Sequence, residues 1–188
     1  MKIDVSNDMT AEETALALLA QGFHPVAIDY SGKNRLAQGF RLPRPTEEWL
    51  RDVYRLNPVL GVGIQIGPEA GLVDIDVDGP AAAPWLHRLF PDGVPPTVAF
   101  QSRRGEHYLF RFDDRLARYG FRVHNHELEI RIGVTGPDSA NVTHTALPPT
   151  RIMGGEPRRW LRTGEILPLP EEFFDRLEAI VAEWTRPS

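Results

Sequence analysis

Three aspartates recur at every second position of one short apolar segment. Residues 71–80 read Gly-Leu-Val-Asp-Ile-Asp-Val-Asp-Gly-Pro, which places Asp74, Asp76 and Asp78 among Leu, Val and Ile. Side chains two positions apart on a β-strand point to the same face. Carboxylates on one face repel each other and cost free energy to bury, unless a cation or a solvent-filled cleft lies against them. Because clustered carboxylates suit hard cations, the segment predicts a strand that carries a divalent-metal site.

A simpler interpretation is an edge strand with one wet face. The aspartates would then point to water, and the buried face would consist of the apolar residues Leu72, Val73, Ile75 and Val77. Aspartate is depleted in strands, and strands rarely carry three successive acids outward, so the metal site is the favoured interpretation.

Length and composition indicate one ordinary globular domain over residues 1–188. The chain of 188 residues is long enough to bury a core, and no internal repeat or low-complexity linker divides it. The absence of cysteine excludes disulfides, thiolate catalysis and cysteine-based zinc modules. The first residues lack an apolar signal region and no apolar run has membrane-spanning length, so we expect a cytoplasmic protein without a membrane partner.

The charge balance limits how the chain can bind nucleic acid. Its net charge of -5 argues against a strong non-specific grip on DNA, because the phosphate backbone favours clustered Lys and Arg. A local basic groove remains compatible with this balance, although the usual interpretation of scattered arginine clusters is solvated surface. The clusters comprise Arg103 and Arg104; Arg111, Arg115 and Arg118; and Arg151, Arg158, Arg159 and Arg162.

Local signals place the helices and strands. Thr10 and Glu13 form a capping box, Gly22 is placed to end the Ala- and Leu-rich helix that follows, and Pro58 stops a second helix that begins near Thr46. We expect helices over residues 10–21, 45–57, 81–89 and 170–184. We expect strands over residues 26–30, 61–66, 71–77, 97–101, 106–112, 128–132 and 143–147, with a hairpin turn at 102–105.

The order of these elements predicts the fold class. Helices and strands are interleaved, but hairpins link most of the strands. We therefore expect an α+β fold, with a mixed, mostly antiparallel sheet flanked by helices and an N-terminal α/β unit, rather than a doubly wound sheet.

Several short motifs follow each other in a fixed order. They are Gly61-Val62-Gly63-Ile64, Asp76-Val77-Asp78-Gly79, Gly105-Glu106-His107-Tyr108-Leu109-Phe110, Glu129-Ile130-Arg131 and Ala146-Leu147-Pro148-Pro149-Thr150. Before them come a helix that ends at Gly22, a turn that leads to Lys33 and a helix that carries Trp49. The ordered set resembles the bifunctional primase-polymerase domain of plasmid, phage and mobile-element replication proteins, a branch of the archaeo-eukaryotic primase superfamily. The resemblance covers about residues 10–165.

The resemblance implies a set of site residues. The family's acidic motif falls on Asp76 and Asp78 and its later single acid on Glu129, which together would hold two Mg²⁺ or Mn²⁺ ions. Asp74 is left over as an additional acid. His107 would bind the triphosphate of the incoming nucleotide. Further nucleotide-binding candidates are Lys33, Arg103, Arg104 and Arg131.

The implied activity is template-dependent nucleotidyl transfer, by primer synthesis or DNA polymerisation. Its substrates would be single-stranded DNA and an NTP or dNTP, and its partners a replicative helicase or a further C-terminal module. Two departures keep a primase-like domain with weak or no catalysis open as an alternative. Arg103 and Arg104 stand in a turn that is usually rich in Ser and Gly, and Glu129 stands where Asp is commoner.

Two other classes compete less well. Asp76-Val77-Asp78-Gly79 also resembles the nucleophile loop of haloacid-dehalogenase-type phosphatases, but Pro80 follows it and no convincing downstream Lys and paired Asp are present. A cupin-like metal site is the other alternative, and it needs an all-β jelly roll, which the expected helices argue against. Its ligands would be His124, His126, Glu129 and His144.

Overall fold

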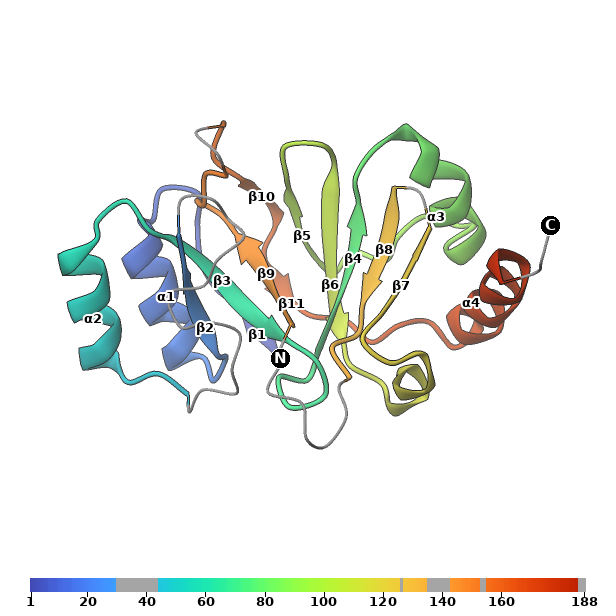
Figure 1. Ribbon diagram of the computed structural model, residues 1–188, viewed down its shortest axis with the longest axis horizontal. Coiled ribbons are helices and arrows are strands. Elements are labelled where there is room, and N and C mark those ends of the chain that lie inside the picture. The colour runs from blue at the N-terminus through green and yellow to red at the C-terminus, as the bar shows by residue number, and fades with distance from the viewer. Residues whose placement is uncertain (30–43, 126, 135–142, 153–154, 186–188) are drawn as a thin grey trace.

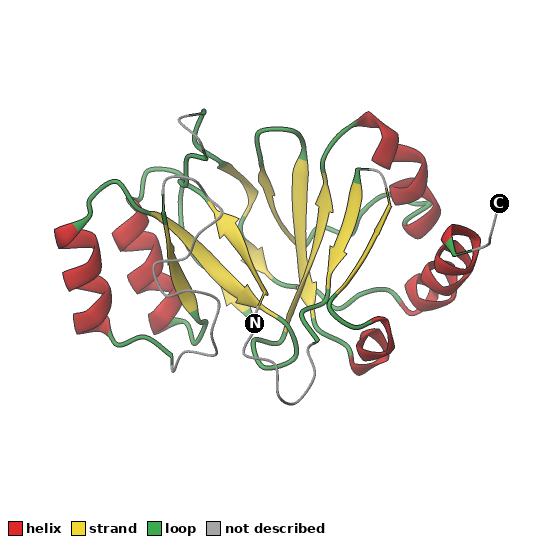
Figure 2. Cartoon of the chain, viewed as in Figure 1, coloured by secondary structure: helices red, strands yellow, loops and turns green. Residues whose placement is uncertain are grey.

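The two larger antiparallel sheets lie between two pairs of helices (Figures 1 and 2). A computed structural model describes residues 1–29, 44–125, 127–134, 143–152 and 155–185. The helices α1 and α2 flank a three-stranded sheet at one end of the molecule, and α3 and α4 flank a six-stranded sheet at the other (Figure 1). The expected α+β class, with mostly antiparallel strands and flanking helices, is confirmed.

The helices begin and end where capping chemistry predicts. The Thr10 hydroxyl accepts from the Glu13 backbone N–H, and the Glu13 carboxylate accepts from the Thr10 backbone N–H. Gly22 follows the helix with a φ of 98°, which favours glycine, and the Thr46 hydroxyl caps the second helix. The α-helices are α1 (Ala11–Ala20), α2 (Glu47–Leu56), α3 (Ala83–Leu89) and α4 (Glu171–Trp184), with 3-10 turns η1 (Pro80–Ala82) and η2 (Asp114–Tyr119).

The acidic segment forms the strand β4, which lies inside the six-stranded sheet. The order of that sheet is β10 (Arg159–Arg162), β5 (Val98–Gln101), β6 (Glu106–Arg111), β4 (Leu72–Val77), β8 (Leu128–Arg131) and β7 (Arg122–Asn125). Neighbouring strands are antiparallel throughout. Since β6 and β8 both pair with β4, the edge-strand interpretation is wrong.

The smaller sheet builds the N-terminal α/β unit. Its order is β2 (Pro25–Ile28), β3 (Gly61–Ile66) and β9 (Thr143–Leu147), so a strand from late in the chain completes it. The short strands β1 (Lys2–Ile3) and β11 (Gly164–Glu165) pair separately. Tyr30, expected at the end of the first long strand, lies outside the described residues.

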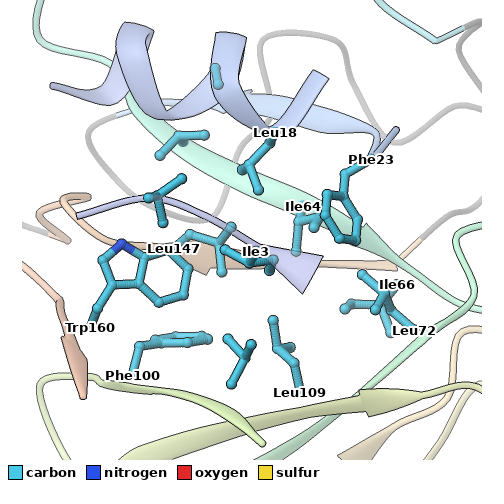
Figure 3. Packing of buried hydrophobic residues seen from close by; sticks show 14 of the residues in the cluster. Ile3, Leu18, Phe23, Ile64, Ile66, Leu72, Phe100, Leu109, Leu147 and Trp160 are labelled. Carbon is cyan, nitrogen blue, oxygen red and sulfur yellow. The ribbon is translucent and has the colours of Figure 1, made fainter. Parts of the chain in front are cut away.

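Hydrophobic clusters cover both faces of the six-stranded sheet. The cluster between the two sheets, shown in Figure 3, includes Ile3, Leu18, Phe23, Ile64, Leu72, Phe100, Leu109, Leu147 and Trp160. The cluster against α3 and α4 includes Val73, Ile75, Phe110, Ile130, Phe173 and Leu177. Because Leu72 belongs to the first cluster and strand side chains alternate, Asp74 and Asp76 face the space between the sheets.

One close backbone contact joins the turn between β5 and β6 to the end of β4. A Cβ atom on Gly105 would lie 1.8 Å from the carbonyl oxygen of Val77. We expect Gly105→Ala to lower the free energy of unfolding by about 1–3 kcal/mol, because the turn must move away from β4. Urea unfolding measures this, with Gly155→Ala as the control, since a Cβ there meets only the Ile152 carbonyl oxygen at 3.2 Å. Equal effects of the two substitutions would contradict the contact.

Candidate functional site

Asp76 lies between His107 and Glu129 in the register of the sheet. It pairs with His107 of β6 on one side and with Glu129 of β8 on the other. Directly opposed residues of antiparallel strands share a face, so all three side chains point toward the three-stranded sheet. Asp76 and His107 are buried, with exposed fractions of 2% and 1%, and Glu129 is partly exposed. The structure thus brings three of the predicted site residues together.

Arg131 is the cation at the centre of this group. Its Nε donates to Glu129 Oε2 at 2.9 Å, its Nη1 to Asp74 Oδ2 at 3.4 Å, and its Nη2 to Asp76 Oδ2. Nη1 also lies 3.4 Å from the Thr145 hydroxyl on β9, which links the two sheets. Burial would lower the pKa of Arg131, but the surrounding carboxylates outweigh burial and raise it.

Asp74 forms a hydrogen bond with the ring of His107. Both Asp74 oxygens lie close to His107 Nδ1, at 3.1 and 3.0 Å, and Asp74 is fully buried. On the other side of the ring, Arg158 Nη1 donates to His107 Nε2 at 3.1 Å. A guanidinium can only donate, so this network assigns the imidazole proton to Nδ1, where it bonds to Asp74. Burial would raise the pKa of Asp74, but His107 and Arg131 lower it below its usual value.

Asp76 is the acid of this group whose ionised form burial disfavours on balance. Burial raises the pKa of Asp76 to about 6, against the attraction of His107 and Arg131. Its Oδ1 lies 3.3 Å from His107 Nε2, but the contact lacks hydrogen-bond geometry, and Oδ1 has no hydrogen-bond partner. A buried carboxylate oxygen without a partner is costly, and a cation would relieve that cost.

The remaining predicted residues lie near the turn between β5 and β6 or outside the described chain. Asp78 follows β4 and forms an ion pair with Arg104 of that turn. Arg103 is exposed on the same turn. Lys33 lies outside the described residues, so its predicted nucleotide contact stays a prediction.

The carboxylates are occupied by arginines in this arrangement. Among the residues that the structure describes, no three His, Asp or Glu side chains are grouped closely enough to hold a metal ion. Arg131 contacts Asp76 and Glu129, and Arg104 contacts Asp78. The oxygen donors nevertheless suit a divalent cation, and the unpartnered Oδ1 of Asp76 is the observation that supports this fit.

Sequence reasoning missed the place of Arg158. The sequence pattern groups it with solvated surface arginines, yet it is partly buried and bonds to His107 and to the Ala146 carbonyl oxygen at 2.9 Å. No local pattern separates it from its neighbours Arg159 and Arg162, so the sequence offers no signal for this contact.

The cupin-type alternative lacks its fold. The α-helices and separate sheets of this structure are not a jelly roll. Of its four suggested ligands, His124 is exposed and His126 lies outside the described residues.

The fold and the site together define an α+β protein in which acidic and basic groups meet on the central strands of an antiparallel sheet. The chain belongs to the bifunctional DNA primase/polymerase N-terminal family, whose model matches residues 15–172. The predicted resemblance is therefore confirmed, and the family implies an enzyme of the primase/polymerase nucleotidyltransferase type. No curated protein matches the sequence. None of the described helices combines the length and apolarity needed to cross a bilayer.

Asp76→Asn should stabilise the fold at neutral pH. Because the pKa of Asp76 is raised from 3.8 to about 6, its ionised form is disfavoured in the folded state, and this penalty is present above pH 6. We expect the variant to gain on the order of 3 kcal/mol at pH 7.5, since the shift spans about two pKa units and each unit corresponds to about 1.4 kcal/mol. The gain should shrink as the pH falls through about 6. Urea unfolding at pH 7.5 and 4.5 measures it, and Asp92→Asn on the exposed surface is the control. A gain that is equal at both pH values would contradict the assignment.

Asp74 can be tested by two substitutions that differ in one property. Asp74→Leu removes the acceptor of the buried His107 Nδ1–H and of the partly buried Arg131, and should cost about 3 kcal/mol of unfolding free energy. Asp74→Asn keeps an acceptor oxygen at the same place and should cost clearly less. Urea unfolding at pH 7.5 compares the variants. Similar losses for Leu and Asn would show that the hydrogen bond to His107 is unimportant for stability.

Proposed function

We propose that this chain catalyses template-dependent nucleotidyl transfer on single-stranded DNA, by primer synthesis, DNA polymerisation or both. The observation that carries the proposal is the row in which Asp76 lies between His107 and Glu129 on one face of the central strands. The family match supports the same chemistry. We also propose that the chain forms one catalytic domain with the archaeo-eukaryotic primase fold.

The carboxylates would hold two Mg²⁺ or Mn²⁺ ions. Asp76, Asp78 and Glu129 are the proposed ligands, and Asp76 Oδ1 is already free of hydrogen bonds. Bound divalent ions would activate the attacking 3′-hydroxyl and offset charge on the leaving pyrophosphate. Arg131 and Arg104 would give up some of their present carboxylate contacts when the ions bind.

His107 is the proposed triphosphate ligand. Asp74 fixes the ring through Nδ1 and leaves the Nε2 edge toward Arg158. A phosphate oxygen only accepts hydrogen bonds, so His107 would bind it by donating from Nε2. Arg104, which precedes His107 on the same hairpin, is a further phosphate ligand in this proposal, together with Arg103, Lys33 and Arg131.

A primase-like domain that binds nucleotide or nucleic acid with weak or no catalysis is the second candidate. The observation in its favour is that Arg131 and Arg104 lie on the carboxylates that the metal ions need. In such a protein these ion pairs would be permanent, and metal ions would not displace them. The phosphatase alternative draws no support from the matched family.

Primer extension separates the two candidates. The assay uses a labelled primer on a single-stranded template, with Mg²⁺ or Mn²⁺ and either nucleotide type. We expect a metal-dependent product from the unmodified chain and a loss of at least about a hundredfold for Asp76→Ala combined with Asp78→Ala, because both proposed metal ligands from β4 and its end are removed.

A matched control removes two exposed acids elsewhere, with Asp92→Ala combined with Asp175→Ala. This control should retain activity. Product formation by the Asp76, Asp78 variant would refute the two-metal mechanism. No product from the unmodified chain, together with intact nucleotide binding, would favour the non-catalytic candidate.

A further inference from the structure

Three arginines that form no ion pair with a described carboxylate line one pocket. Elsewhere in the described chain many arginines form ion pairs, whereas Arg103, Arg162 and Arg176 form none with a described carboxylate but do not line the pocket. The ion-paired arginines include Arg51, Arg55, Arg88, Arg104, Arg111, Arg115, Arg118, Arg122 and Arg131. Among the described residues, the Arg151 side chain donates to the Gly155 carbonyl oxygen at 3.3 Å, and Arg158 donates to His107 and to the Ala146 carbonyl oxygen and lies over the Phe100 ring. Neither of them, nor Arg159, forms an ion pair with a described carboxylate. Three cations in one place without a direct ion pair indicate a site for an anion from outside.

The pocket has room for a group larger than one phosphate. Its volume is about 580 Å³, and it lies between the start of β3, the segment after β9 and the segment that leads into β10. Leu60 and Pro149 contribute apolar wall, and Arg151, Arg158 and Arg159 contribute the cations. A volume of this size falls within the usual range for small-molecule sites.

The charge of the lining is opposite to that of the whole chain. Three arginines line the pocket and Asp8 is its one acidic lining residue among those described, while the chain carries a net charge of -5. The planar guanidinium fork matches the oxygens of a phosphate and binds them by charge-assisted hydrogen bonds. Phosphate is therefore the anion that this lining fits best.

Arg158 joins the pocket to the candidate active site. It lines the pocket and also donates from Nη1 to His107 Nε2 at 3.1 Å. The pocket therefore adjoins the face on which His107 and Asp76 lie. Its ligand would lie beside the reacting groups without touching the proposed metal ligands.

We propose that this pocket is a phosphate-binding site, with Arg151, Arg158 and Arg159 as its ligands. The phosphate comes either from the backbone of a bound single strand or from a nucleotide triphosphate. The choice between these sources rests on the proposed function, whereas the phosphate site itself rests on the pocket and its arginines.

Binding without metal tests the site. Fluorescence anisotropy with a labelled single-stranded oligonucleotide, and calorimetry with tripolyphosphate, are both run in EDTA so that the proposed metal site does not contribute. Arg151→Gln combined with Arg159→Gln should weaken binding on the order of tenfold at low salt, because two charge-assisted contacts are lost. The control is Arg88→Gln combined with Arg118→Gln, which removes the same charge from ion-paired arginines outside the pocket lining. Thermal unfolding verifies that both double variants fold.

A third variant should act in the opposite direction. Asp8→Asn removes the acidic lining residue and should strengthen phosphate binding about two- to threefold, consistent with a solvent-exposed charge. A gain of this kind cannot result from damage to the fold. Unchanged or weaker binding in Asp8→Asn would count against an anion in the pocket.

The two ligands distinguish the sources. If the bound single-stranded DNA supplies the phosphate, the double variant weakens oligonucleotide binding but not tripolyphosphate binding. The slope of log K against log salt for the oligonucleotide then becomes shallower by about 1.4, at about 0.7 for each of the two lost phosphate contacts. If the nucleotide supplies it, tripolyphosphate binding weakens. The proposal would be overturned if, for both ligands, the Arg151→Gln, Arg159→Gln variant lost no more binding affinity than the control double variant. Because the readout is metal-free binding, an absence of polymerisation would refute the proposed function and leave this result standing.

Discussion

The ion pairs of Arg131 are the interaction on which the centre of the structure depends. Asp74 and Asp76 are buried on neighbouring positions of one face, and Glu129 lies across from Asp76. Without a cation among them, these charges would repel each other at a place that water hardly reaches. Arg131 contacts all three, and its bond to Thr145 extends the network from the six-stranded sheet to β9. The same cation that permits the burial of these acids therefore also connects the two sheets.

The site lies where the apolar core between the sheets ends. Along β4, Leu72 belongs to the core, and Asp74 and Asp76 follow it on the same face. On the antiparallel strand β6, Leu109 belongs to the core and pairs with Asp74, and His107 pairs with Asp76. The His107 ring stacks on Phe100 with 4.5 Å between ring centroids and 8° between planes. A rigid core thus holds the imidazole on one side, and Asp74 holds it at Nδ1. A histidine fixed in this way needs little reorganisation to meet a ligand, which is what a preorganised site requires.

The sequence predicted those features that local chemistry specifies. The capping box at Thr10, the glycine after α1 and the alternating aspartates each carry their own physical signal, and the structure has all of them. It did not predict β7 and β10, because their four-residue segments have few apolar side chains in alternation and form strands only through pairing with β8 and β5. Within the site, the meeting of Asp76 with Arg131 and of His107 with Arg158 depends on register between segments about 50 residues apart in sequence. The family resemblance identifies some of these residues as site residues, but only the folded structure shows which charged groups pair with each other.

Under the proposed function, the arginines would couple the binding of metal ions to the binding of the nucleotide. A divalent ion bound to Asp76 or Asp78 would displace the guanidinium of Arg131 or Arg104. For Arg131, which is partly buried, a guanidinium left without an anion would be costly. A triphosphate brings new oxygens for that guanidinium. Each ligand would then remove the penalty that the other creates, which is a coupling free energy between the two binding events. Metal ions alone would bind weakly, because the acids already have a counter-ion within the protein, and the full set of charges would be compensated only when the nucleotide arrives.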